Sequence, residues 1–169
     1  MKIKLVKLKS DNYPLLTEMM DEWSKEEKKK QVPYSIFKND YKNKELYLNE
    51  LEVKENHSFL VEDSTFFLSA DDRVFLGAVN IRHRLNEQLF NKGGNIGYGI
   101  RPSYRGLGFG KIQLELALKE ASRLNLNRVL LCCDENNEFS RRIIVSCGGI
   151  RDFDYVENEK VTQRYWIEL

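Results

Sequence analysis

Hydrophobic positions along the chain repeat at two spacings, which predict alternating strands and helices. A spacing of two residues, or a short apolar run, predicts strands at residues 2–8, 65–70, 73–83, 96–101, 128–133, 149–154 and 161–169. A spacing of three to four residues predicts helices at residues 11–30, over most of 34–56 and at 112–124. A last helix is predicted to open at residues 134–140 and to end at Gly148-Gly149. Gly77 indicates a bulge within its strand, and residues 158–159 a hairpin turn. This order of elements predicts a mixed α/β fold around one central sheet.

One stretch joins a strand, a glycine-rich turn and the start of a helix. It runs from Asn95 to Lys111 and reads NIGYGIRPSYRGLGFGK. Backbone N–H groups without bulky side chains can converge on one anion at such a turn, and the helix dipole favours negative charge there. Arg105 and Lys111 add positive charge to the same loop. The stretch therefore predicts a site for phosphate or pyrophosphate.

Two common phosphate-binding motifs do not fit this loop. A P-loop requires Ser or Thr after its Gly-Lys pair, whereas Ile112 follows Lys111. The dinucleotide motif G-x-G-x-x-G also meets Lys111 where its third glycine belongs. What remains is Arg105-x-x-Gly108-x-Gly110, which resembles motif (Q/R)-x-x-G-x-(G/A) of the GNAT superfamily of N-acetyltransferases. In that superfamily the loop holds the pyrophosphate of acetyl-CoA, although a tight glycine-rich turn would explain the residues without any ligand.

The segments around the loop extend the resemblance from about residue 77 to residue 149, and more faintly to the C-terminus. Residues 134–140 resemble the D-x-x-N-x-x-(S/A) segment that follows the fifth strand of GNAT enzymes, and a helix and Gly148-Gly149 come after it. Residues 82–86, placed before GGNIGY, resemble a bacterial subgroup of predicted acetyltransferases. The ordered series is much more specific than any one motif.

The resemblance implies a fold and a reaction. The fold is a GNAT-like mixed, mainly antiparallel central sheet of six to seven strands flanked by about four helices, within one domain spanning residues 1–169. Two parallel strands at 96–101 and 128–133 would separate at their ends and admit the pantetheine arm. The reaction is direct transfer of an acetyl group from acetyl-CoA to a primary amine of a small molecule or peptide.

The same resemblance assigns the residues that would contact acetyl-CoA. The loop and strand contribute Ile100, Arg105, Gly106, Leu107, Gly108, Phe109, Gly110 and Lys111, and the later helix contributes Asn137, Ser140 and Arg142. The backbone near Ile100 would pair with pantetheine or donate an N–H to the oxyanion. Helix capping by Asn137, and a first-turn role for Ser140, are the structural alternatives.

Two positions depart from the catalytic pattern of many GNAT enzymes. Ile144 stands where a tyrosine often protonates the leaving thiolate, and Asn95 stands where a glutamate often serves as base. Expelling the thiolate unprotonated at pH 7 costs about 2 kcal/mol, whereas deprotonating a lysine-like amine costs about 4.6 kcal/mol. The missing base is therefore the larger problem, unless the acceptor is a weakly basic amine.

Side chains elsewhere in the sequence offer replacements for both catalytic groups. We expect His83 to serve as base, because a hairpin connection would place it opposite Asn95 and on the same face. A strand-end histidine bonded to its own loop is the structural alternative, and a one-residue shift of register would reverse its face. Ser140 would lie near the sulfur, and Tyr98 is a further candidate for the acid, as are Tyr104 and Tyr165.

Composition limits the partners and the compartment. The net charge is +1, from 27 basic and 26 acidic side chains, so neither nucleic-acid binding nor a polybasic membrane surface is expected. The apolar runs of the chain are shorter than the roughly 20 residues that a membrane-spanning helix needs. The three cysteines match no zinc spacing, which predicts no metal site and reduced thiols of a cytoplasmic protein. A monomer or a homodimer fits equally.

Some alternatives stay open at this point. The aromatic residues of the first helices would wall the acceptor pocket of a GNAT-like fold or would pack in the core; they are Trp23, Tyr34, Phe37 and Tyr41. The chain could also be a CoA-binding regulatory domain with impaired catalysis, which Ile144 permits. A phosphate-binding module without acyl chemistry is disfavoured by the Asn-x-x-Ser segment.

Overall fold

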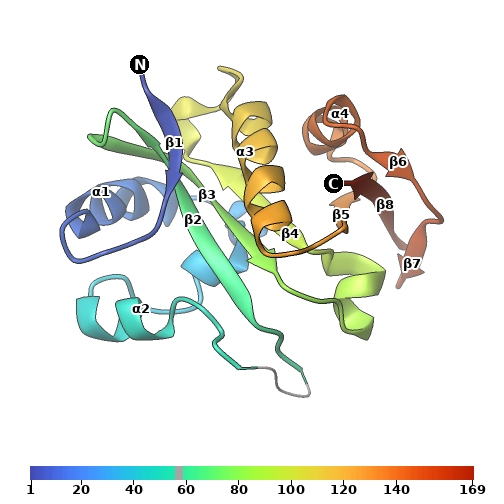
Figure 1. Cartoon of the computed structure of the whole chain (residues 1–169), viewed down its shortest axis with the longest axis horizontal. Helices are drawn as coiled ribbons and strands as arrows, with labels where there is room; N and C mark the ends of the chain where they lie inside the picture. Colours follow the sequence, from blue (N-terminus) through green and yellow to red (C-terminus); the bar gives the residue numbers. More distant parts are fainter. Residues whose placement is uncertain (56–58) are drawn as a thin grey trace.

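The computed structural model describes residues 1–55 and 59–169 and arranges their strands in two four-stranded sheets (Figure 1). The first sheet has the order β1-β2-β3-β4 and is antiparallel throughout; its strands are β1 Ile3–Val6, β2 Asp63–Ala70, β3 Val74–Arg82 and β4 Ile96–Ile100. In the second sheet β8 pairs with each of the other three; the strands are β5 Arg128–Asp134, β6 Ile150–Arg151, β7 Tyr155–Glu157 and β8 Lys160–Glu168.

The expectation of one central sheet with six to seven strands was therefore wrong. β4 and β5 lie next to each other, but their backbones are joined only through Asn95, whose N–H donates to Leu130 O at 2.7 Å. The Asn95 side chain completes the junction, because Oδ1 accepts from Leu130 N–H at 2.8 Å and Nδ2 donates to Arg82 O at 3.1 Å. Beyond this point the ladder between β4 and β5 does not continue, so the sheet splits.

Four α-helices are found in the described ranges, together with short helical turns. The helices are α1 Tyr13–Trp23, α2 Lys44–Glu50, α3 Phe109–Arg123 and α4 Glu138–Ser146, and the turns are η1 Lys28–Lys30, η2 Tyr34–Ile36, η3 Leu89–Gly93 and η4 Pro102–Tyr104. α1 is shorter than the predicted 11–30 helix. Residues 24–30 offer no apolar side chain to pack, and a short helix without packing is unstable in water. Of the helical range predicted at 34–56, residues 34–55 form only η2 and α2, and residue 56 lies outside the described residues.

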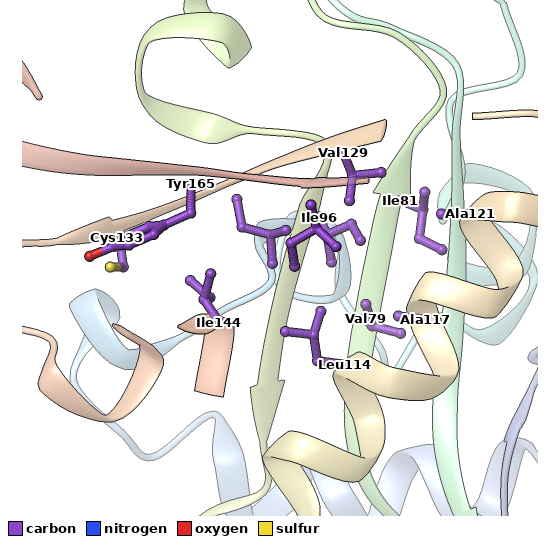
Figure 2. Packing of buried hydrophobic residues seen from close by; sticks show 12 residues of the cluster. Val79, Ile81, Ile96, Leu114, Ala117, Ala121, Val129, Cys133, Ile144 and Tyr165 are labelled. Carbon is purple, nitrogen blue, oxygen red and sulfur yellow. The ribbon is translucent and has the colours of Figure 1, made fainter. Parts of the chain in front are cut away.

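Helices cover both faces of the first sheet. On one face α3 packs against β3 and β4, and α4 packs beside α3 against β5 of the second sheet; Figure 2 shows Leu114, Ile144 and the valine and isoleucine side chains between them. On the other face α1, η2 and α2 enclose Phe67, Phe75 and Ala78. Neighbouring strand residues point to opposite faces, so each residue of β3 and β4 belongs to one side or the other.

The predicted hairpin turn is confirmed, and the predicted bulge lies within one residue of the observed one. The hairpin between β7 and β8 turns at Asn158 and Glu159, both with positive φ. The ladder of β2 and β3 shifts register opposite Leu76, one residue from the bulge expected at Gly77. A side chain at Gly77 would collide with the Gly99 carbonyl oxygen at 2.5 Å, which is why the smallest residue stands there.

Candidate active site

The glycine-rich loop ends in the first turn of α3 and offers a row of unpaired backbone donors. Gly106 has φ of 77° and Gly108, which caps the helix, has φ of 88°, a conformation that favours glycine. Within the described chain, the N–H groups of residues 106–111 donate to no acceptor. A Cβ at Gly106 or Gly108 would meet nothing within 4 Å. The loop therefore presents open space lined by amide donors at a helix N-terminus.

Gly110, the last residue of the motif, has a different role. A Cβ there would lie 2.8 Å from Cδ1 of Ile143, on α4. Glycine at this position thus allows α3 and α4 to approach each other. The sequence motif places three glycines together, and the structure divides them between an open cradle and a helix contact.

The two basic residues of the loop are not equivalent. Arg105 turns away from the amides, donating from Nε to Ile100 O at 2.9 Å and from Nη1 to Glu26 at 3.0 Å. Its guanidinium also lies 6.0 Å from the ring centre of Trp23. Lys111 stays exposed, with Glu115 at 3.8 Å. The charge expected from Arg105 is therefore offset by Glu26, and Lys111 is the cation that remains beside the cradle.

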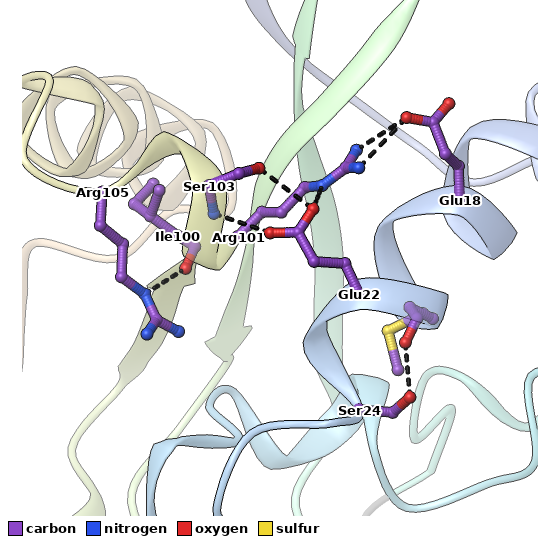
Figure 3. A network of polar contacts seen from close by, with 8 residues as sticks. Glu18, Glu22, Ser24, Ile100, Arg101, Ser103 and Arg105 are labelled. Atoms are coloured by element: carbon purple, nitrogen blue, oxygen red, sulfur yellow. Dashed lines mark hydrogen bonds and ion pairs between the residues drawn. The ribbon is translucent and has the colours of Figure 1, made fainter.

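A polar network fixes the turn between β4 and the loop to α1 (Figure 3). Arg101, whose side chain is only 10% exposed, bonds to Glu22 through Nε and to Glu18 at 3.1 Å. Ser103 N–H donates to Glu22 at 2.7 Å. Burial alone would raise the pKa of Glu22, but the hydrogen bonds from Arg101 and Ser103 and the charge of Arg101 together lower it. The glycine loop thus starts from an anchored turn.

Along one edge, β4 pairs with no strand in the part of the chain that the structure describes. Arg82 N–H donates to Asn95 O and Arg101 N–H to Leu76 O, so odd-numbered residues of β4 point their backbone groups at β3. By alternation, Tyr98 and Ile100 direct theirs toward the gap beside β5. Ile100 O is occupied by Arg105, which leaves the Ile100 N–H and both Tyr98 backbone groups facing the gap.

Tyr98 and Ser140 meet on the α3–α4 side of this gap. The Tyr98 hydroxyl lies 3.2 Å from Ser140 Oγ, in the first turn of α4. Burial raises the pKa of Tyr98 to about 12, while the contact with Ser140 acts in the opposite direction. A phenol with this pKa stays protonated at neutral pH and can donate a proton. Ile144, one turn further along α4, is buried in the core and has no such capacity.

The remaining residues of the expected CoA contact set lie on the outside of α4. Asn137 caps the helix, accepting from Ser140 N–H at 3.1 Å, and its contact with CoA stays a prediction. Arg142 pairs with Glu138 at 2.6 Å and is 71% exposed. Large apolar side chains also stand open here: Phe139 on α4 is 82% exposed and Leu107 in the loop 64%. The hydrophobic periodicity of residues 138–146 does not predict that Phe139 is exposed, so no feature of the sequence points to this residue.

The expected position of His83 was wrong by one residue. Arg82, not His83, stands opposite Asn95, so alternation turns His83 to the other face. There His83 Nε2 lies 2.8 Å from Ser64 Oγ, and Nδ1 lies 3.7 Å from Glu62. Asn95 is itself buried in the junction between the sheets. Neither residue faces the gap from the α1 side.

The α1 side of β4 is lined by two glycines and by side chains from three elements. A Cβ at Gly99 would lie 2.2 Å from the Val32 carbonyl oxygen and 2.9 Å from the Trp23 ring, so this glycine permits close packing. Trp23 is fully buried, and Phe37 and Tyr41 pack in the same cluster, whereas Tyr34 is 69% exposed. The core interpretation thus holds for three of the four aromatic residues.

A cavity of about 350 Å³ lies at the end of β5. It is bounded by the end of β5, the β7–β8 hairpin and η3, and its lining residues are Lys92, Cys132, Cys133, Asp134, Tyr155, Glu157, Asn158, Lys160 and Thr162. Burial raises the pKa of Cys132 to about 12 and that of Cys133 to about 11, so both thiols are protonated at neutral pH. Thiolate chemistry is therefore not what this cavity offers.

No group of three or more His, Cys, Asp or Glu side chains among the described residues is placed to hold a metal ion. None of the helices in this part of the chain combines the length and apolarity that a membrane span requires.

Comparison with known proteins gives a consistent result. The profile of the acetyltransferase (GNAT) domain family matches residues 2–150. No curated protein matches the sequence. Among solved structures, a chimera of the spermidine N-acetyltransferase SpeG from Vibrio cholerae with hSSAT superposes with a TM-score of 0.67 at 17% identity, covering 99% of this chain and 96% of that one.

Two further structures show the same fold. A mutant SpeG from Vibrio cholerae gives a TM-score of 0.62 at 17% identity, with coverage of 99% and 95%. RimL, a ribosomal L7/L12 alpha-N-protein acetyltransferase in complex with coenzyme A, gives 0.65 at 11% identity, with coverage of 99% and 94%. At such identities the likeness establishes the fold alone.

Proposed function

This chain belongs to the GNAT family of acetyltransferases, and from that membership we propose that it transfers the acetyl group of acetyl-CoA directly to a primary amine. The amine nitrogen would attack the thioester carbonyl carbon. A C–N bond forms, the C–S bond breaks, the nitrogen loses a proton and the thiolate gains one. One domain would carry both substrates, with acetyl-CoA on the α3–α4 side of the gap and the amine on the α1 side.

The observation that carries this proposal is the row of unpaired amides at residues 106–111, together with the open edge of β4. The amides face space that a Cβ would enter without contact, which fits a pyrophosphate drawn to a helix N-terminus. The free backbone groups of Tyr98 and Ile100 fit an extended amide chain such as pantetheine. RimL, which superposes on this chain, is in complex with coenzyme A. Phe139 and Leu107 would cover apolar parts of the ligand.

Proton transfer would rest on Tyr98 and Ser140, two of the three residues expected to be catalytic, and not on His83. Tyr98, supported by Ser140, is the proposed acid for the leaving thiolate, in place of the tyrosine absent at position 144. His83 keeps its predicted role only as a proposal without geometric support, because it bonds to Ser64 on the opposite face. We therefore favour an acceptor amine with a low pKa, which at pH 7 loses its proton to water for about 1 kcal/mol if it is an α-amine.

Three observations on the protein itself test the proposal. Calorimetry should detect CoA binding, and a thermal shift should be larger with CoA than with ATP or NAD. Thiol release from acetyl-CoA should depend on an added amine, and mass spectrometry should find that amine acetylated. Binding of CoA without transfer to any amine would favour the alternative of a catalytically impaired regulatory domain, and stabilisation by ATP or NAD alone would refute CoA binding as the function.

The remaining expectations about setting are retained as proposals. Three free thiols, two of them held protonated by burial, suit a reducing cytoplasmic setting. A monomer and a homodimer both stay compatible with the proposed reaction, and sedimentation at the assay concentration distinguishes them.

A further inference from the structure

We propose that Arg82 recognises a carboxylate on the acceptor, so that the substrates of this enzyme are amines that carry a carboxylate near the reacting nitrogen, such as α-amino acids. The inference rests on the proposed acetyl transfer and deepens it by naming the acceptor class. It also predicts a difference from the spermidine N-acetyltransferases of the same fold, because spermidine is a cation without any carboxylate.

Arg82 is the last residue of β3, and this position brings it to the end of the gap. Its backbone N–H donates to Asn95 O at 2.7 Å, next to the junction with β5. Its guanidinium extends over Gly97 of β4, where a Cβ would lie 3.1 Å from Nη2 and 3.2 Å from Nη1. A side chain at position 97 would therefore displace the guanidinium. Glycine at 97 keeps this cation against the strand that borders the reaction site.

The hydrogen bonds of Arg82 use only one side of its guanidinium. Nη1 donates to Gly93 O at 3.2 Å and to Gly94 O at 3.4 Å. Nε and Nη2 have no acceptor in the described part of the chain, and neither is sealed away from solvent. These two nitrogens present the parallel N–H pair that a carboxylate accepts with its two oxygens. The free edge of Arg82 is therefore shaped for a planar anion.

A protein carboxylate does not already fill this place. Asp63 stands opposite Arg82 on β2, and its charge acts on the guanidinium, but the two form no ion pair within 4.0 Å. Its Oδ1 instead accepts from Val53 N–H at 2.9 Å. Arg164 is fully buried and donates from Nη1 to Asp152 at 3.0 Å, while its Nη2 has no partner and is closed off from solvent. The free edge of Arg82 differs because solvent, and therefore a ligand, can reach it.

Arg82 does not line the cavity, but its charge reaches a residue that does. Gly97 on β4 and Cys132 on β5 each come two residues after the junction residues Asn95 and Leu130, and the charge of Arg82 acts on the Cys132 thiol that lines the cavity. The cavity lining carries two basic side chains, Lys92 and Lys160, and two acidic ones, Asp134 and Glu157, and Glu157 pairs with Lys92. The lining therefore favours neither sign of charge, and the preference for a carboxylate rests on the forked edge of Arg82.

Matched acceptor pairs test the inference directly. Alanine is compared with ethylamine, lysine with cadaverine and phenylalanine with phenethylamine, each pair differing by one carboxylate, and spermidine is added. For the wild type we expect kcat/KM to be about 10²-fold or more higher for the amino acid of each pair. Arg82→Gln should remove this preference, mainly by raising KM for the amino acids, and should leave kcat/KM for the simple amines and the Kd for CoA unchanged.

Two further variants separate recognition from structure. Arg84→Gln removes the same charge from an exposed position two residues away and should keep the preference for amino acids. Arg82→Lys retains a cation that can donate to the Gly93 carbonyl but lacks the fork, so it should recover folding and only part of the preference. A thermal shift with CoA verifies that each variant is folded.

The results of these assays either support or overturn carboxylate recognition by Arg82. Equal or better use of the decarboxylated amines or of spermidine overturns the inference while leaving acetyl transfer intact. If no compound of the panel is acetylated, calorimetry on the CoA-bound protein decides: amino-acid binding that Arg82→Gln abolishes supports the inference, and absence of such binding to the wild type refutes it. Failure to bind CoA would refute the proposed function itself.

Discussion

Replacing Gly108 by alanine isolates the contribution of the loop to CoA binding. Gly108 has φ of 88°, and a Cβ there would meet nothing within 4 Å, so the added methyl group would project into the space above the amides of residues 106–111. Gly148, after the end of α4, provides the matched control. Its φ is 95° and a Cβ there would also meet nothing within 4 Å. Both substitutions therefore impose the same backbone strain, and only one blocks the cradle.

The expected magnitudes follow from these two effects. A left-handed backbone costs an L-residue about 1–2 kcal/mol, so both variants should lose about that much unfolding free energy. Hydrogen bonds from amides to a charged phosphate contribute about 1.5–3 kcal/mol each. If the methyl group blocks two of them, the loss of about 3–6 kcal/mol raises the Kd for CoA by about 10²–10⁴. Gly148→Ala should leave this Kd unchanged.

Calorimetry with CoA and with pantetheine measures the effect. Pantetheine lacks the pyrophosphate, so its affinity should be the same for the wild type and both variants. Denaturant unfolding of the apo proteins gives the strain term separately. A Gly108→Ala protein that binds CoA as tightly as Gly148→Ala does, with equal stability losses, would refute the assignment of the loop to the pyrophosphate.

Three other predictions address the chemistry and the fold. Tyr98→Phe should lower kcat by up to about tenfold and leave the Kd for CoA unchanged. Because the pKa of Tyr98 is raised to about 12, ionisation of this phenol should not reduce the wild-type rate at pH 9. A fall in the wild-type rate near pH 9 that is absent from Tyr98→Phe would contradict this assignment. His83→Ala should change kcat by less than about twofold, because His83 bonds to Ser64 away from the gap; a loss of about 10²-fold together with the ascending limb of the pH profile would restore His83 as the base. Because the pKa of Glu22 is lowered in the folded protein, its ionised carboxylate stabilises the fold at pH values above its ordinary pKa, and this stabilisation is lost as the pH falls through the lowered pKa. The unfolding free energy of Glu22→Gln should therefore depend less on pH below about 4.5 than that of the wild type. An unchanged acid dependence would show that Glu22 is not held by Arg101.

The sequence by itself determined the local parts of the site. The strand–loop–helix around residues 95–111 was predictable, because glycine conformation and helix-start donors depend on neighbouring residues only. The Asn137–Ser140 cap was predictable for the same reason. The glycines at 97 and 99 also carried a readable signal, since two glycines on one face of a strand indicate close approach by other groups.

Tertiary structure decided which distant groups meet. Arg105 bonds to Glu26, 79 residues earlier in the chain, and no local pattern contains that pairing. A one-residue register difference put Arg82 rather than His83 opposite Asn95, because the side-chain period of a strand is two and each single step reverses the face. The division into two sheets also depends on contacts between distant residues. Asn95 closes one end of the gap with its side chain and backbone, and beyond Asn95 the edge of β4 that faces β5 pairs with no described strand. Local sequence fixes backbone conformation and the direction of side chains along an element, whereas the partners of those side chains depend on how elements far apart in sequence are brought side by side.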